Sequence, residues 1–188
     1  MLPPALWRSE PFAASRHSRL CIGSQWTRNT NSNRAGESSM SVHSSSRQIL
    51  IQGLMLVLVG LVWGIVVPHT PYPRLALGAH IQLVTNGLLI IVLAVLLLTL
   101  PHRVGRRSLW VMLMAVALTW AMGISEIANA WWGTIQMLPI AAAQAGATGG
   151  AAWQELVVKL THIGAGLGLI AAWSLLLVGF LRPVAGKE

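Results

Sequence analysis

The chain has 188 residues, of which 54% are hydrophobic and only 10% are charged, far below the roughly 25% charged residues of soluble domains. This composition predicts a membrane protein of one domain. The formal charge of +8 would suit a nucleic-acid-binding protein, but six of the 13 Lys and Arg precede residue 48 and the others flank apolar segments. That distribution indicates membrane orientation and argues against a nucleic-acid partner.

The first 46 residues are rich in Ser, Arg and Asn and have no hydrophobic periodicity. Such a segment buries too little apolar surface to offset the entropy of ordering, so we predict a disordered tail over 1–46. Met40 precedes the run SVHSSSRQIL and is a plausible start for a shorter protein. Our hypothesis is that residues 1–39 are dispensable, and we expect 183–188 to form a short C-terminal tail.

Four apolar segments follow, at about 48–67, 75–100, 108–132 and 153–181. Each is near or above the roughly 20 residues that a helix needs to cross a bilayer, and isolated strands would leave backbone groups unpaired in lipid. The sequence therefore predicts an all-α membrane protein in which residues 47–182 form a four-transmembrane-helix bundle.

The basic residues between the segments predict the orientation of this bundle. The second connection holds three arginines, the first holds one and the third holds none. Arg47 precedes the first segment, and Arg182 and Lys187 follow the last. By the positive-inside rule we expect both termini and the second connection in the cytoplasm.

Two segments contain small residues four positions apart, Gly60/Gly64 in the first and Gly164/Gly168 in the fourth. Such pairs let helices approach closely. Packing within the bundle is the favoured interpretation, and a homo-oligomer contact through either face is the alternative.

Polar side chains of the last three segments gather in their outer halves, where each ionisable group costs about 2.5–3.5 kcal/mol to insert unless it has a partner or a function. They are His80, Gln82, Thr85, Asn86, Glu126, Asn129, Gln154, Glu155, Lys159 and His162. Their shared depth predicts a convergent site.

Helical spacing sorts these residues by face. Glu126 shares its face with Gly123 and Ala130, which leave room for a neighbour, and its own helix offers no cation. In the second segment Gln82 and Asn86 group together, whereas His80 points about 120° or more away from them.

In the fourth segment Glu155, Lys159 and His162 form a stripe, with Gly166 following on the same face. The alternative interpretation is a structural Glu155–Lys159 pair at a helix end, since the acid precedes the base by four residues. A lone histidine such as His80 or His162 is also often only a hydrogen-bonded core residue.

Aromatic residues cluster at the outer ends of the segments: Tyr72, Trp131, Trp132 and Trp153. An interfacial aromatic belt is the favoured interpretation. The alternative is that some of them, Trp132 and Trp153 in particular, line an aromatic substrate pocket.

Several strings resemble the hydroxylaminobenzene mutase family of small bacterial membrane enzymes: PRLALGAH (73–80) with Asn86-Gly87, WWG (131–133), MLPIAA (137–142) and WQE (153–155). The resemblance covers about residues 47–181. It implies a multi-pass protein of the bacterial inner (plasma) membrane. The chain departs from some members in carrying Gln82 where they have an acidic residue two positions after the histidine.

The resemblance implies an isomerase that converts hydroxylaminobenzene-type arylhydroxylamines to 2-aminophenols, in nitroaromatic degradation and with no cofactor required. On this interpretation Glu126 and Glu155 are the acid/base pair, and His80 and His162 carry protons or anchor the small aromatic substrate. Substrate-binding roles are assigned to Asn86, Asn129, Gln82, Lys159, Trp132 and Trp153.

Two other function classes remain open. His80, His162 and either Glu126 or Glu155 have the residue types of a two-histidine, one-carboxylate metal site, and the two histidines also suit axial haem ligation in a small redox protein. A small membrane carrier is the second class, although the almost purely apolar cytoplasmic halves of the second and fourth segments offer no polar path.

Overall fold

The computed structural model describes residues 43–182. Its first helix covers residues 43–66 and continues into a 3₁₀ turn, η1 (Val67–His69). It is followed by α2 (Pro73–Thr99), α3 (Arg106–Trp132), α4 (Pro139–Ala145) and α5 (Ala152–Leu181). The four long helices are apolar and long enough to cross a membrane, and 43–182 contains no strand, so the predicted all-α, four-span architecture is confirmed.

The structure differs from the sequence prediction at the start of the first helix and in the connection between α3 and α5. The first helix begins at His43, so residues 43–46, which we assigned to the disordered tail, are helical. Polar residues can extend a helix beyond its apolar stretch, because the backbone hydrogen bonds continue regardless of side-chain polarity. The rest of the predicted tail, with Met40, and residues 183–188 lie outside the described residues. Helix α4 was not predicted, although Pro139 at its start and Gly146 at its end are common helix boundaries.

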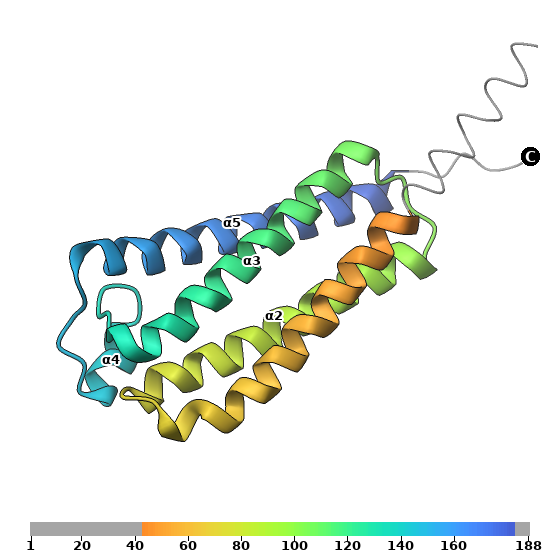
Figure 1. Cartoon of the computed structure of the whole chain (residues 1–188). Coiled ribbons are helices and arrows are strands. Elements are labelled where there is room, and N and C mark those ends of the chain that lie inside the picture. Colours follow the sequence, from red (N-terminus) through yellow and green to blue (C-terminus); the bar gives the residue numbers. More distant parts are fainter. Residues whose placement is uncertain (1–42, 183–188) are drawn as a thin grey trace, which may run out of the picture. The chain divides into compact units, whose positions relative to one another are not determined.

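The helices run up and down, so that the first helix and α3 begin at the same end of the bundle, where α5 ends (Figure 1). Helix α5 packs along α3, and α2 packs against α3 on another side, while α2 and α5 make few contacts with each other. Buried Leu83, Ile90 and Met112 contribute to the core between these helices. The loose contact between α2 and α5 leaves space for the site described below.

The glycine pair of the first helix faces α2. A Cβ atom at Gly60 would lie 2.9 Å from Leu83, and one at Gly64 would lie 2.9 Å from the His80 ring. Both distances are too short for any real side chain, so these glycines allow the two helices to pack closely.

The glycine pair of α5 faces α3 in the same way. A Cβ atom at Gly168 would lie 3.2 Å from Ala115, and one at Gly164 would lie 3.6 Å from Leu118. The two glycine pairs therefore pack within the bundle, which is the interpretation that the sequence favoured. Homo-oligomerisation stays a prediction.

The end of the bundle at which α3 finishes is fastened by the first connection. The Tyr72 backbone N–H donates to the Ala130 carbonyl over 3.2 Å, and the Tyr72 ring lies against Gly133. Gly133 ends α3 with φ of 63°, a left-handed conformation that glycine adopts without strain. These contacts fix the end of α3 that carries Glu126.

Candidate active site

The centre of the site is the Glu126 carboxylate on α3, which is completely buried. The small residues on its helix face make room for α2, as predicted: Leu83 packs directly on Gly123, where a Cβ atom would lie only 2.5 Å away. Five residues before Leu83 on α2, a Cβ atom at Gly78 would lie 4.0 Å from Glu126 Oε2. The carboxylate is thus held in a space that neighbouring helices leave open.

The partner of Glu126 is His162 on α5, itself 9% exposed. Glu126 Oε1 lies 3.0 Å from His162 Nε2, within the distance of an ion pair. The other ring nitrogen, Nδ1, is 2.8 Å from the Val158 carbonyl, which can only accept, so Nδ1 carries a hydrogen. The Nε2 atom is therefore the one that faces the carboxylate.

A second contact holds α3 and α5 in register beside this pair. The hydroxyl oxygens of Ser125 and Thr161 lie 2.7 Å apart, so that one hydroxyl can donate across this contact while the other donates to a carbonyl of its own helix. Ser125 and Thr161 each directly precede a member of the Glu126–His162 pair in sequence. The Ser125–Thr161 contact therefore restricts how far the Glu126 carboxylate and the His162 imidazole can move apart.

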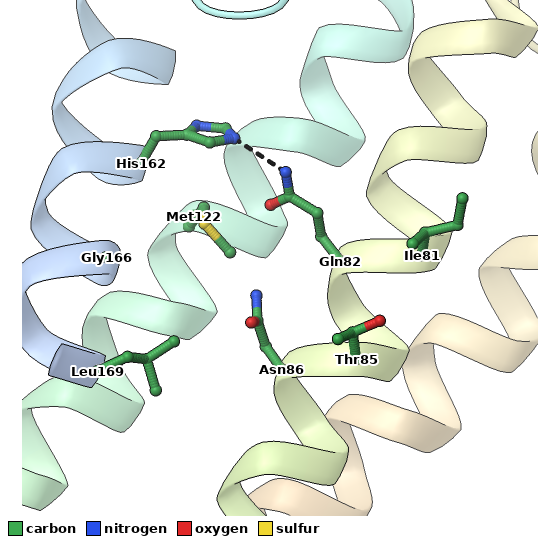
Figure 2. Close-up of a pocket in the computed structure, with 8 residues that line it drawn as sticks. All are labelled: Ile81, Gln82, Thr85, Asn86, Met122, His162, Gly166 and Leu169. Atoms are coloured by element: carbon green, nitrogen blue, oxygen red, sulfur yellow. Dashed lines mark hydrogen bonds between the residues drawn. The ribbon is translucent and has the colours of Figure 1, made fainter. Parts of the chain in front are cut away.

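Helix α2 adds an amide to the pair. Gln82 Nε2 lies 3.4 Å from His162 Nε2, as the dashed line in Figure 2 marks. Gln82 Oε1 and both Glu126 oxygens are buried without a hydrogen-bond partner among the described residues. Buried polar atoms are rarely left unpaired. The cluster of these unpartnered oxygens therefore indicates a position where a polar ligand could bind.

A cavity of about 320 Å³ lies next to these atoms, between α2, α3 and α5. Figure 2 shows side chains from the three helices directed into it. Its lining comprises Ile81, Gln82, Thr85, Asn86, Met122, His162, Gly166 and Leu169. Ile81, Thr85 and Gly166 are exposed, so the cavity opens sideways on the bundle surface between α2 and α5. Pockets of this size hold small ligands.

The structure places Glu155 elsewhere. Its Oε1 accepts hydrogen bonds from the backbone N–H groups of Ile135 (2.9 Å) and Gly150 (3.2 Å), and its Oε2 accepts one from Gln136 (3.0 Å). The carboxylate thus organises the connection between α3 and α5 and does not line the cavity. The predicted pairing of Glu155 with Glu126 in one acid/base site is not assembled.

Lys159 and Asn129 also lie away from the cavity lining. Lys159 is exposed and makes no ion pair with Glu155 or with any other described residue. Asn129 Oδ1 accepts hydrogen bonds from the backbone N–H and the hydroxyl of Thr134, which fastens the chain after α3. Its Nδ2 atom is buried without a partner among the described residues.

The outer tryptophans pack against one another and do not line the cavity. The rings of Trp132 and Trp153 meet edge to face with centroids 5.1 Å apart, which joins the end of α3 to the start of α5. Trp131 packs against Trp63 of the first helix at 5.6 Å. Their positions suit the belt interpretation better than the substrate-wall interpretation for Trp132 and Trp153.

His80 points to the first helix, as its angle on α2 indicated. Its Nδ1 atom lies 2.7 Å from the Gly60 carbonyl, so His80 and His162 face different neighbours. No group of three His, Cys, Asp or Glu side chains within 43–182 is arranged to hold a metal ion. The two-histidine, one-carboxylate set proposed from sequence is therefore not assembled.

Four residues of the cavity were not named as site residues from the sequence: Ile81, Met122, Gly166 and Leu169. Met122 precedes Glu126 by four residues and Gly166 follows His162 by four, so both share the face of a polar residue. The sequence analysis had already placed Gly166 on the face of His162, without assigning it to the site. The same spacing rule would have identified Met122, had it been applied to large apolar residues.

Comparison with known proteins agrees with this membrane architecture. The styrene oxide isomerase family model matches residues 45–181. Hydroxylaminobenzene mutase HabA of Ectopseudomonas oleovorans is 32% identical over 136 residues, which cover 71% of this chain and 97% of the relative. Hydroxylaminobenzene mutase HabB of the same organism is 31% identical over 156 residues, or 79% and 93% of the two chains.

No solved structure matches the chain significantly. The family match spans nearly all of the described residues, and both mutases align over almost their whole length. The resemblance inferred from the sequence is thereby confirmed. The chain belongs to the styrene oxide isomerase family, and it is an isomerase.

Proposed function

We propose that the protein isomerises arylhydroxylamines to 2-aminophenols in the cavity between α2, α3 and α5. The observation that carries the proposal is the buried Glu126–His162 pair, 3.0 Å apart, beside a cavity of about 320 Å³. The names of the two similar mutases supply the substrate class. A proton donor and acceptor next to a small, mostly apolar pocket is what this isomerisation needs.

The first step breaks the N–O bond. Glu126 and His162 share a proton between Oε1 and Nε2, and delivery of that proton to the substrate hydroxyl releases water. The aryl nitrogen and ring are left with one positive charge. The carboxylate that has lost its proton stabilises this cation in a water-poor site.

The second step forms the C–O bond and restores the ring. The released water adds to the ortho carbon and gives one proton back to the Glu126–His162 pair. The ortho C–H proton is then lost while the nitrogen gains one, which yields 2-aminophenol. Two protons are taken up and two are released, so the reaction is a net isomerisation and the pair ends as it began.

The remaining cavity residues suit binding of the aromatic substrate. Gln82 and Asn86 present amides from one face of α2 and are suited to hold the hydroxylamino group. Met122 and Leu169 offer apolar contacts to the ring, and a thioether packs well at a ring edge. Because the cavity opens sideways, we propose that neutral substrate reaches it from the bilayer of a bacterial inner membrane, during nitroaromatic degradation.

Product analysis tests this function. Purified full-length protein is incubated with phenylhydroxylamine at neutral pH, and 2-aminophenol and 4-aminophenol are separated. Acid rearrangement in free solution favours the para product, so protein-dependent formation of the ortho product is the expected result. An unchanged substrate, or a product ratio equal to that without protein, contradicts the proposal.

An aryl epoxide is the second candidate substrate, because the matching family carries the name styrene oxide isomerase. Opening such an epoxide also places positive charge next to an aromatic ring, which the same carboxylate would stabilise. A parallel incubation with styrene oxide, followed by analysis for an isomeric carbonyl compound, distinguishes the two. Turnover of styrene oxide without turnover of phenylhydroxylamine favours the epoxide reaction.

A bound metal or haem remains an alternative proposal. Of the two candidate histidine ligands, the geometry favours His80. Its Nδ1 donates to the Gly60 carbonyl over 2.7 Å, so Nε2 keeps a free lone pair, as is usual for a metal-ligating histidine. His162 already faces Glu126 and would not be the second ligand from the same chain. An absorption spectrum of the purified protein, with His80→Ala as control, tests it: a Soret band that the variant loses supports haem at His80.

A further inference from the structure

A groove on the opposite half of the bundle is separate from the proposed active site. It runs between the first helix and α3 as two adjoining cavities of about 200 Å³ and 490 Å³. The cavities share Gln48, Trp110 and Leu113, so they form one continuous depression. Its start at Arg106 lies 20 residues before Glu126 along α3, or about 30 Å at 1.5 Å per residue.

The end of the groove nearest the start of α3 is polar and basic. Arg106 and Ser45 line it, and Gln48 reaches it from the first helix. Arg106 is exposed and makes no ion pair with any residue of 43–182, and the first turn of α3 contains no acidic side chain. A guanidinium without a carboxylate partner is suited to bind a phosphate through two parallel hydrogen bonds.

The other end of the groove is apolar. Met114, Ala117 and Trp120 line it along successive turns of α3. It closes at Trp120, whose Nε1–H donates to Gln52 Oε1 over 2.9 Å. From Arg106 to Trp120 the groove follows 14 residues of helix, or about 21 Å, which exceeds the roughly 15 Å hydrocarbon thickness of one leaflet.

We propose that this groove is a binding site for one anionic phospholipid, with the phosphate at Arg106 and an acyl chain along α3 toward Trp120. Charge complementarity selects this occupant: a cation lies at one end, and the rest is lined mostly by apolar side chains, with Gln48 and Gln52 on the side of the first helix. Arg103 and Arg107 are exposed near the same end but do not line the groove. A basic residue near an anionic headgroup contributes on the order of 1 kcal/mol.

Lipid selectivity of the delipidated full-length protein in neutral detergent tests the site. Phosphatidylglycerol and phosphatidylcholine with identical acyl chains are titrated, and bound lipid is counted by native mass spectrometry. We expect phosphatidylglycerol to bind about fivefold more tightly, which is the affinity ratio that corresponds to about 1 kcal/mol. Equal binding of the two lipids overturns the proposal. Thermal unfolding is measured in parallel, and the proposal is also overturned if inorganic phosphate alone stabilises the protein as much as phosphatidylglycerol does.

Three variants locate the site. Arg106→Gln is expected to abolish the preference for phosphatidylglycerol, whereas Arg107→Gln, its neighbour outside the groove lining, keeps it. Ala117→Phe fills the apolar end and is expected to weaken both lipids at least fivefold while leaving the arginines intact. If Arg106→Gln and Arg107→Gln lower the preference for phosphatidylglycerol equally, the attraction to the basic end is diffuse and the proposed phosphate site is wrong. If Ala117→Phe does not weaken lipid binding, the acyl chain does not occupy the groove.

Discussion

Glu126 on α3 and His162 on α5 lie with Oε1 and Nε2 3.0 Å apart in the interior of the bundle. Both oxygens of Glu126 otherwise lack a partner among the described residues, and the imidazole is oriented from behind by the Val158 carbonyl. The imidazole is therefore held in place, whereas the carboxylate beside the cavity still has free hydrogen-bonding capacity. In a structural ion pair the carboxylate usually accepts further hydrogen bonds, which Glu126 lacks among the described residues.

A double-mutant cycle measures whether the pair acts as one unit. His162→Ala leaves a buried carboxylate without a cation, so we expect it to lower the free energy of unfolding by about 3–5 kcal/mol and to abolish turnover. In the double variant Glu126→Gln/His162→Ala, stability is expected to recover in part while turnover stays lost. Unfolding in detergent and product formation are measured on the same samples. Additive stability losses would mean that the two side chains are not coupled.

Glu155 is expected to matter for stability more than for chemistry. Glu155→Gln removes the charge that three backbone N–H groups share, and hydrogen bonds to charged groups each contribute about 1.5–3 kcal/mol. We expect a loss of about 2 kcal/mol in the free energy of unfolding, with turnover per folded molecule nearly unchanged. Lys159→Gln, on the exposed face of the same helix, is the control and should change neither quantity.

Gly166 is expected to set the size of substrate that the cavity admits. A Cβ atom at Gly166 meets nothing within 4 Å, so Gly166→Ala and Gly166→Leu should fold while filling the cavity progressively. We expect turnover of ring-substituted arylhydroxylamines to fall before that of phenylhydroxylamine, chiefly through a higher KM. Each variant is assayed with a series of para-alkyl substrates.

Gly164→Ala is the matched control for this experiment, because it makes the same change two residues earlier on α5 but faces Leu118 at an ordinary contact distance of 3.6 Å. It should leave the substrate preference unchanged. If Gly164→Ala and Gly166→Ala shift the preference equally, the effect comes from the helix backbone and the cavity is not the substrate site.

Much of the fold could be predicted from the sequence because lipid imposes simple rules. Four long apolar segments required four helices, and the helical angles correctly separated His80 from Gln82 and Asn86. The small-residue face around Glu126 correctly indicated a close neighbour, which is Leu83 of α2. Such inferences need only the periodicity of one helix at a time.

The site was predicted less well, because a helix angle does not tell which backbone groups a side chain reaches. Glu155 shares the face of His162, yet it bonds to the connection before α5, whose conformation has no periodic signal. Trp132 and Trp153 likewise meet each other through that connection. Both cases depend on a loop between helices. Depth along the membrane alone does not tell which residues contact this loop and which line the cavity.

The most direct test of the account compares Glu126→Gln with Glu155→Gln in the conversion of phenylhydroxylamine to 2-aminophenol, at saturating substrate and corrected for folded protein. If Glu126 is the acid/base group, kcat of Glu126→Gln falls by about 10²–10⁴-fold, and Glu155→Gln stays within a few fold of the parent. A parent-like kcat for Glu126→Gln, together with a large loss for Glu155→Gln, would contradict the account and move the chemistry to the start of α5.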